Sequence, residues 1–221
     1  LDWVVFHVEP SYLKLWRNYK RSLKQRNLLL KNNGSIDEIR SWNKGFSELG
    51  ESIHLLRSSV FEILEPSLAQ ITSNLLGDEV RFLCERGWHD EIGLEQALIK
   101  SESRDSHLRS TQVGPHRADI SISFDARVAK KQVSRGQQKL LACAMVLGSI
   151  EIVQEYTEKP LLLLLDDPAA ELDGNSIKKL MDEVVLLGAQ VIATSIDYNK
   201  TLLPGEPHVF HVEHGQIKKI I

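Results

Sequence analysis

The chain has 221 residues, of which 42% are hydrophobic and 26% charged, with a formal net charge of -3. This composition excludes a disordered, fibrous or strongly basic protein, so any nucleic-acid contact must come from a local patch. The longest apolar run, residues 140–147, is far shorter than the ~20 residues of a membrane span, and no signal peptide is visible. Cys84 and Cys143 lack metal-ligand spacing, which favours reduced thiols and a cytoplasmic location.

Residues 11–31 contain seven Lys or Arg and no Asp or Glu. The apolar residues Leu13, Trp16, Leu23 and Leu30 recur at helical spacing on one side, and the basic residues Lys14, Arg17, Arg21, Lys24 and Lys31 recur on another. We therefore predict an amphipathic helix with a basic face. Such faces are usually only solvated, but with Tyr12, Trp16 and Tyr19 between the cations this one also suits a DNA phosphate backbone.

Ser35 stands three residues before Glu38, which predicts a capping box at the start of the next helix. Apolar residues then recur in heptad register at Trp42, Phe46, Leu49, Ile53, Leu56, Val60 and Ile63. This spacing predicts a helix packed back on the first, ending near Glu65 and Pro66, with Gly45 and Gly50 weakening it locally. A third helix over residues 66–76 would end at Gly77.

For the segment that follows, we predict a strand at residues 80–84, a short helix at 91–101 and a polar loop at 101–106. The alternation of Ile120, Ile122 and Phe124 predicts a second strand with one buried face. His116 and Arg117 lie between these elements, directly after a Gly-Pro turn. They have either a local hydrogen-bonding role or a place near phosphate or DNA, and both alternatives stay open.

Residues 134–139, Ser-Arg-Gly-Gln-Gln-Lys, precede the apolar run at 140–147. A serine cap, a glycine and a long helix behind them form an anion site from free backbone amides and the positive end of the helix. The hexapeptide is similar to the signature motif of ABC-type ATPases, with Arg135 where transporters usually have glycine. The alternative is an ordinary capped helix without a ligand.

Residues 161–165 are five leucines, followed by Asp166 and Asp167. They predict a central parallel strand buried on both faces, with two carboxylates at its carboxyl end, where they could hold Mg²⁺ and orient a water. This is a Walker B pattern, although an aspartate after a strand can also be a simple turn or helix cap. A helix at 174–187, a second buried strand at 189–194 and a closing hairpin of 209–213 with 216–221 follow.

The order of a signature-like helix, a Walker B strand and the residues Glu171, Leu172 and Asp173 matches the order of parts in ABC-type ATPase heads. We therefore expect an α/β fold, a partial ABC-type P-loop ATPase head with a helical arm. Residues 1–155 would form lobe II, with the arm at about 9–76 and the strands and signature helix at about 80–155. Residues 156–221 would form the C-terminal part of the nucleotide-binding lobe I.

Two features lead us to expect a C-terminal fragment of a longer protein. The glycine-rich loop ending in Gly-Lys-Ser/Thr, which cradles phosphates, does not occur in the sequence, and the chain does not start with methionine. ABC-type heads also commonly carry a histidine after the second strand to contact the γ-phosphate, and here Thr194 and Ser195 stand in its place.

Over nearly its whole length the chain resembles the RecF family of bacterial recombination mediators, in the superfamily of ABC-type and chromosome-structural ATPases. The resemblance is carried by residues 1–10, 23–27, 113–119 (Val-Gly-Pro-His-Arg-Ala-Asp), 134–137 and 165–173. The pair of Gly-Pro-His-Arg and Ser-Arg-Gly-Gln motifs is its specific part, and Ala169-Ala170 departs slightly from a more usual Ala-Ser.

The resemblance implies a full-length protein that binds ATP and Mg²⁺, dimerises around ATP and hydrolyses it slowly. It also implies binding to gapped or single-strand/double-strand junction DNA, and work with RecO and RecR to load RecA, in the cytoplasm at the nucleoid and away from membranes. The fragment alone would be inactive. The alternatives are another ABC-type or chromosome-structural head, or a non-catalytic helical module that docks proteins.

The resemblance also assigns roles to residues of this chain. Asp166 would hold Mg²⁺ and Asp167 would polarise the attacking water. Ser134, Arg135, Gly136 and Gln137 would form the signature that contacts the partner subunit's ATP, with Glu171 and Asp173 in the D-loop. The candidate DNA contacts are Lys14, Arg17, Arg21, Lys24, His116 and Arg117.

Overall fold

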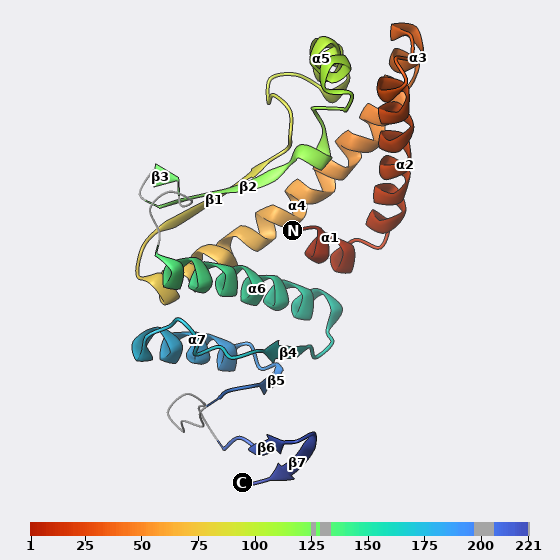
Figure 1. The fold of residues 1–221 in the computed structure, drawn as a ribbon. Helices are drawn as coiled ribbons and strands as arrows, with labels where there is room; N and C mark the ends of the chain where they lie inside the picture. Colours follow the sequence, from red (N-terminus) through yellow and green to blue (C-terminus); the bar gives the residue numbers. More distant parts are fainter. Residues whose placement is uncertain (125–126, 129–133, 197–205, 221) are drawn as a thin grey trace.

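The computed structural model describes residues 1–124, 127–128, 134–196 and 206–220. The α/β fold is elongated, with a helical arm at one end, a three-stranded sheet beside the arm and two two-stranded sheets at the other end (Figure 1). In chain order the elements are α1 (Asp2–Val8), α2 (Tyr12–Lys31), α3 (Ile36–Ser41), α4 (Asn43–Leu76), β1 (Val80–Glu85), α5 (Leu94–Leu108), the 3₁₀ turn η1 (Pro115–Arg117), β2 (Asp119–Phe124), β3 (Arg127–Val128), α6 (Arg135–Thr157), β4 (Leu162–Leu165), α7 (Gly174–Leu186), β5 (Gln190–Ala193), β6 (Phe210–Glu213) and β7 (Gln216–Lys219).

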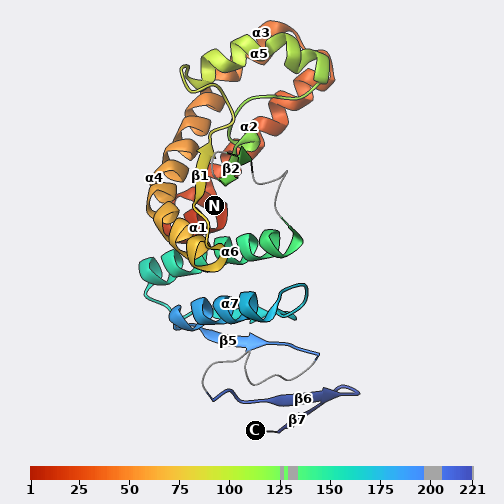
Figure 2. The ribbon, with the colours of Figure 1, turned by 90° about the vertical axis from the view of Figure 1, so that its left-hand side faces the viewer.

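The arm is a helical hairpin in which α4 runs back along α2 (Figures 1 and 2). The predicted helix at residues 11–31 is confirmed as α2, which buries Leu23 and Leu30. The capping box is also confirmed: the Ser35 hydroxyl accepts from the Glu38 amide, and the Glu38 carboxylate accepts from the Ser35 amide. The tip of the hairpin therefore forms from local signals.

The predicted helix end at Glu65 and Pro66 is wrong, because α4 continues without interruption to Leu76. Proline inside a helix removes one backbone hydrogen bond and costs roughly 3 kcal/mol. Burial of Leu64, Leu68, Ile71 and Leu75 offsets this cost. The predicted stop at Gly77 is correct, since this residue is the left-handed C-cap with φ 76°.

The predicted loop at residues 101–106 is also wrong, because α5 extends to Leu108. Asp105 is fully buried and its carboxylate accepts from Arg26 Nη1 at 2.7 Å. Arg26 is itself fully buried on the inner side of α2. This ion pair fixes the polar segment as helix and joins α5 to the arm.

The strand predictions after the arm are correct in position. β1 pairs antiparallel with β2, with Val80 opposite Phe124 and Glu85 opposite Asp119. β2 also pairs antiparallel with β3. The partly buried Ile120, Ile122 and Phe124 pack on the main core. The closing hairpin is confirmed as β6 and β7, joined through His214 and Gly215, which both have positive φ. Its predicted last residue, Ile221, lies outside the described residues.

The β4 strand pairs in parallel with β5, as the two-strand prediction requires. Burial on both faces is not observed: Leu163 is 5% exposed, whereas Leu162 and Leu164 are 52% and 67% exposed. The predicted second buried strand is likewise mostly exposed, with Ile192 at 52%. Within the described residues β4 and β5 pair only with each other, so neither outer edge of this sheet has a paired strand.

Helix α6 lies between two hydrophobic cores (Figure 2). Leu141, Ile152 and Val153 belong to the core of the arm and β1, while Leu140, Ala144, Leu147 and Ile150 belong to the core of β4 and α7. In the part of the chain that the structure describes, α6 alone is long and apolar enough to span a membrane by length and composition. Its packing against α4 and α7 accounts for this apolar character.

Candidate functional site

The start of α6 carries the predicted signature residues. Ser134 is the N-cap, and its hydroxyl accepts from the Gln137 amide at 3.2 Å while the Gln137 side chain accepts from the Ser134 amide at 2.9 Å. This capping box fixes the entry into the helix and leaves the amides of Arg135 and Gly136 in the unbonded first turn. The geometry is that of an anion-binding helix end.

The turn after β4 holds the predicted Walker B carboxylates together with Thr194. The Thr194 hydroxyl donates to Asp166 Oδ1 at 2.6 Å and accepts from the Asp167 amide at 3.0 Å. The Thr194 amide donates to the Leu165 carbonyl at 2.9 Å. Thr194 therefore ties the end of β5 to the end of β4 and orients Asp166 from the position where a histidine was expected.

Asp167 and Glu171 both adopt left-handed backbone conformations, with φ 41° and 66°. Few residues other than glycine do so without strain, so the turn between β4 and α7 is held by its surroundings. Asp173 ends this turn as the N-cap of α7, accepting from the amides of Asn175 and Ser176, both at 2.9 Å. Hydrogen bonds from the Ser176 amide and hydroxyl and from the Asn175 amide lower the pKa of Asp173.

Lys139 connects the signature helix with the Walker B turn, and sequence reasoning missed it. Its Nζ donates to the Ala170 carbonyl at 2.5 Å and lies 3.4 Å from the Asp167 carbonyl oxygen. A Cβ on Gly136 would lie 3.5 Å from the Glu171 carbonyl oxygen, so the two segments are in contact. A lysine directly before the apolar run at 140–147 was the available signal.

Asp166 fits the role of a magnesium ligand. One of its oxygens accepts from Thr194, and the exposed carboxylate retains acceptor capacity for a cation. Mg²⁺ is usually held by one or two carboxylates together with waters and substrate phosphates. Within the described ranges no three His, Cys, Asp or Glu residues are grouped so that they could hold a metal ion by themselves.

The predicted basic face is exposed on α2: Lys14, Arg17, Arg21 and Lys24 all point to solvent. The predicted aromatic partners are mostly unsuited to DNA, because Tyr12 is 3% exposed and Tyr19 is fully buried. Trp16 is half-buried, with the Arg57 guanidinium 5.2 Å from its ring centre. Among the described residues of the arm, Trp42 is the exposed aromatic side chain, at 37%.

His116 lies on the buried side of α2, away from the basic face. Its Nδ1 lies 2.7 Å from the Tyr19 hydroxyl and its Nε2 lies 3.0 Å from the Thr111 carbonyl oxygen. Burial lowers the pKa of His116. Neutral His116 can accept from Tyr19 and donate to Thr111, which matches the local hydrogen-bonding role. Arg117 is exposed and makes two long contacts, to Thr111 and Gln112.

A carboxylate pair at the end of a parallel strand, a capped helix start and the turn before α7 pack together, and the α/β fold that carries them is that of an ABC-type ATPase head. No protein-family model matches the chain. The chain belongs to the RecF family: it is 37% identical to the DNA replication and repair protein RecF of Acinetobacter baylyi over 228 residues, and 36% identical to RecF of Coxiella burnetii over 223. These matches cover 100% and 98% of this chain and 63% and 61% of the relatives.

Solved structures agree with this assignment. The structure of the recombination mediator protein RecF-ATP in the RecFOR pathway has a TM-score of 0.80 at 26% identity, covering 100% of this chain and 61% of that one. An Smc head domain from Pyrococcus furiosus, bound to the C-terminal domain of ScpA, has a TM-score of 0.50 at 15% identity, a likeness of fold. The chain thus spans about three fifths of the length of its RecF relatives.

Proposed function

We propose that this chain is the signature and Walker B portion of a RecF protein that dimerises on ATP and acts in recombinational DNA repair at the bacterial chromosome. The observation that carries the proposal is the contact between Lys139 of the signature helix and the turn after Asp166 and Asp167. It makes the signature and the Walker B pair one structural unit. Residues 1–155 would serve as lobe II and 156–221 as the end of lobe I.

In this proposal each residue has a separate task. Bound with ATP, Mg²⁺ would supply positive charge at the phosphates, with Asp166 as its ligand. Asp167 would orient a water from the strained turn, and Thr194 would hold both aspartates in place. Ser134 and Gly136 would present backbone amides to the γ-phosphate held by the partner subunit, with Arg135 and Gln137 beside them. Glu171 and Asp173 would form the D-loop edge of the dimer.

Dimerisation is tested in the full-length protein with Ser134→Arg. A large cation at the cap blocks the amides that receive the partner's phosphate, so ATP should bind each monomer as before while dimers no longer form. Light scattering after size exclusion, with and without ATP, measures the dimer. Ser134→Thr, which keeps a capping hydroxyl, is the matched control and should still dimerise. A loss of ATP affinity in the Ser134→Arg monomer would contradict the proposal that Ser134 contacts the ATP of the partner subunit.

Hydrolysis is tested with Asp167→Asn. The variant should dimerise on ATP and turn it over more slowly than the wild type, because the amide cannot polarise the water. The 221-residue chain alone should not hydrolyse ATP. If this chain alone hydrolyses ATP and Asp167→Asn abolishes that hydrolysis, the proposal that the site needs residues outside this chain is refuted.

DNA binding is assigned to the basic face of α2. The proposal is supported by Lys14, Arg17, Arg21 and Lys24, which are exposed on a helix without acidic residues. The substrate we propose is gapped or junction DNA, with RecO and RecR as partners in loading RecA. Both ring nitrogens of His116 have partners within the protein, so we do not propose that it contacts DNA. Arg117, next to it, remains a candidate for DNA contact.

Replacing the four cations with alanine should weaken binding at every sequence alike. The slope of log affinity against log salt should flatten by about one unit for each phosphate that the variant no longer neutralises. A matched variant removes four exposed cations elsewhere, Arg81, Arg104, Lys178 and Lys218, and should bind as the wild type does. If the two variants have the same salt slope, DNA does not bind to the basic face of α2. If the four-alanine variant loses only the binding of a protein partner, the arm is a docking module.

A further inference from the structure

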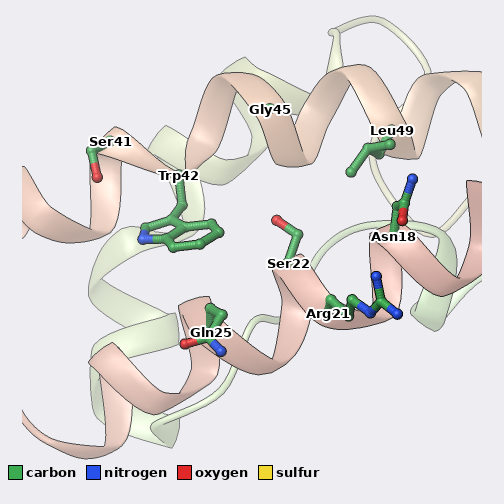
Figure 3. A pocket seen from close by; sticks show the side chains of 8 residues that line it. All are labelled: Asn18, Arg21, Ser22, Gln25, Ser41, Trp42, Gly45 and Leu49. Carbon is green, nitrogen blue, oxygen red and sulfur yellow. The ribbon is translucent and has the colours of Figure 1, made fainter.

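A groove of about 340 Å³ lies between α2 and the start of α4. Each helix contributes one stripe at helical spacing: Asn18, Arg21, Ser22 and Gln25 from α2, and Trp42, Gly45 and Leu49 from the other side, with Ser41 at the end. In Figure 3 the Trp42 ring and the Ser22 hydroxyl project into the space between the helices, opposite Gly45. The groove exists because Ser22 and Gly45 leave the helix crossing without large side chains.

Of the hydroxyls that line this groove, that of Ser41 donates to the Glu38 carbonyl at 2.7 Å, whereas the polar side chains from α2 have no partner in the described part of the protein. Among the described residues, the side chains of Asn18, Arg21, Ser22 and Gln25 make no hydrogen bond or ion pair, and the Trp42 ring makes no aromatic contact. Ser22 is the informative member, because it is only 8% exposed and still lacks a partner. Its hydroxyl is not one of the fully buried polar atoms without a partner, so it is reached through the groove, where water or a ligand can bond to it.

The lining sets the chemistry of that ligand. It offers one exposed aromatic face, one guanidinium, two amides and two hydroxyls, of which that of Ser22 has no partner, and none of the eight lining residues is acidic. Arg17 and Lys24 lie one turn to either side of Arg21 on the same helix. A planar ring with hydrogen-bonding edges, attached to an anion, matches all of these groups. The volume is at the lower end of that of small-molecule sites, ~300–1,000 Å³, and suits one nucleotide.

We propose that this groove binds one unpaired nucleotide of single-stranded DNA, with its base against Trp42 and its phosphate at Arg21. The amides of Asn18 and Gln25 and the Ser22 hydroxyl face the edges of the base. The proposal rests on the proposed function in that the basic face of α2 holds the adjoining DNA. It adds a specific site for an unpaired base, by which a gap is distinguished from a continuous duplex.

Gly45 supplies a selective block. A Cβ at this position meets nothing within 4 Å, so a larger side chain fills the groove without a clash. Gly45→Leu should therefore occupy the base site, and Gly45→Ala is the matched control that adds one methyl group. Both changes raise the helix propensity of α4, so neither acts by unfolding the arm.

The experiment uses the full-length protein and duplexes with a one-nucleotide gap opposite 2-aminopurine, whose emission is quenched on stacking with an indole. The 2-aminopurine emission of gapped DNA should be quenched when the wild type or Gly45→Ala binds. With Gly45→Leu and with Trp42→Leu the quenching should disappear and gap affinity should fall about tenfold. Affinity for continuous duplex should not change. Undiminished gap affinity and quenching with Gly45→Leu would overturn the proposal.

The arms of the test separate this site from the proposed function. Alanine at Lys14, Arg17 and Lys24, with Arg21 kept, tests the basic face through the salt slope on continuous duplex. If that slope flattens while Gly45→Leu has no effect, the basic face binds DNA and the groove does not bind a base. If neither variant changes DNA binding and Gly45→Leu abolishes binding to a protein partner, the groove is a docking site, and the proposal is wrong.

Discussion

Replacing Asp105 with asparagine tests what holds α5 on the arm. Arg26 Nη1 donates to Asp105 Oδ2 and to the Thr111 hydroxyl, both at 2.7 Å, and both charged side chains are fully buried. Asp105→Asn leaves the guanidinium charge buried without its counter-ion. Removing one partner of such a pair costs about 3–5 kcal/mol. We expect a loss of this size in the free energy of unfolding.

The assay combines urea unfolding followed by circular dichroism with amide hydrogen exchange of α2 and α5, which reports local opening. The matched control is Glu102→Gln, which breaks the pair with Arg40 one turn away on the same helix. That pair has distances of 2.8 and 2.9 Å, but the Arg40 side chain is 52% exposed, so its loss should cost much less than loss of the buried pair.

A double variant tests the physical cause. Arg26→Met together with Asp105→Leu leaves no unpaired charge and should recover part of the loss of Asp105→Asn. A cost for Asp105→Asn no larger than that for Glu102→Gln would refute the reasoning, since it would mean that the buried charge finds solvent or another partner.

Three further changes have defined outcomes. Because burial keeps His116 neutral in the folded state, stability should decrease as pH falls below about 6.5, where the unfolded chain takes up the proton; denaturant midpoints across pH measure this. Lys139→Met should raise hydrogen exchange at residues 167–171 and weaken ATP-driven dimerisation, because the turn loses its cation. Gly148→Val should cost about 1–3 kcal/mol in urea unfolding, because a Cβ would lie 2.8 Å from Leu68 Cδ2.

Each of these changes has its own control. His116→Gln should remove its part of the pH dependence, and an unchanged pH profile would show that the imidazole is not the group responsible. Lys139→Arg keeps the charge and should restore dimerisation; equal defects in both Lys139 variants would indicate a merely structural role. Ala142→Val, on the exposed side of α6, should leave the free energy of unfolding nearly unchanged. If it costs as much stability as Gly148→Val, crowding where α6 crosses α4 is not the cause.

Features set by neighbouring residues could be predicted from the sequence. The capping box at Ser35, the serine cap at Ser134, the stop at Gly77 and the hairpin turn at His214 depend on groups within a few residues of one another. The Walker B strand was placed correctly because its five leucines stand apart from any helical period.

The errors come from interactions between distant segments. Pro66 ends an isolated helix, yet burial against α6 carries α4 through it. Arg26 looks like one more cation of a basic helix, and only Asp105, 79 residues away, shows that it is buried. The site shows the same limit: Asp166 was predicted, but Thr194 and Lys139 act on its turn from 28 and 31 residues away.

The uninterrupted helix α4 is long enough to act as a lever on the tip of the arm. Its fulcrum is the crossing with α6, where Gly148 lies against Leu68, and its far end is Asn43 beside the groove. The roughly 25 residues between Asn43 and Leu68 span about 37 Å at 1.5 Å per residue. A tilt of about 5° at the fulcrum therefore moves the arm tip by about 3 Å. A small rotation of α6 that tilted α4 would thus be amplified at Trp42.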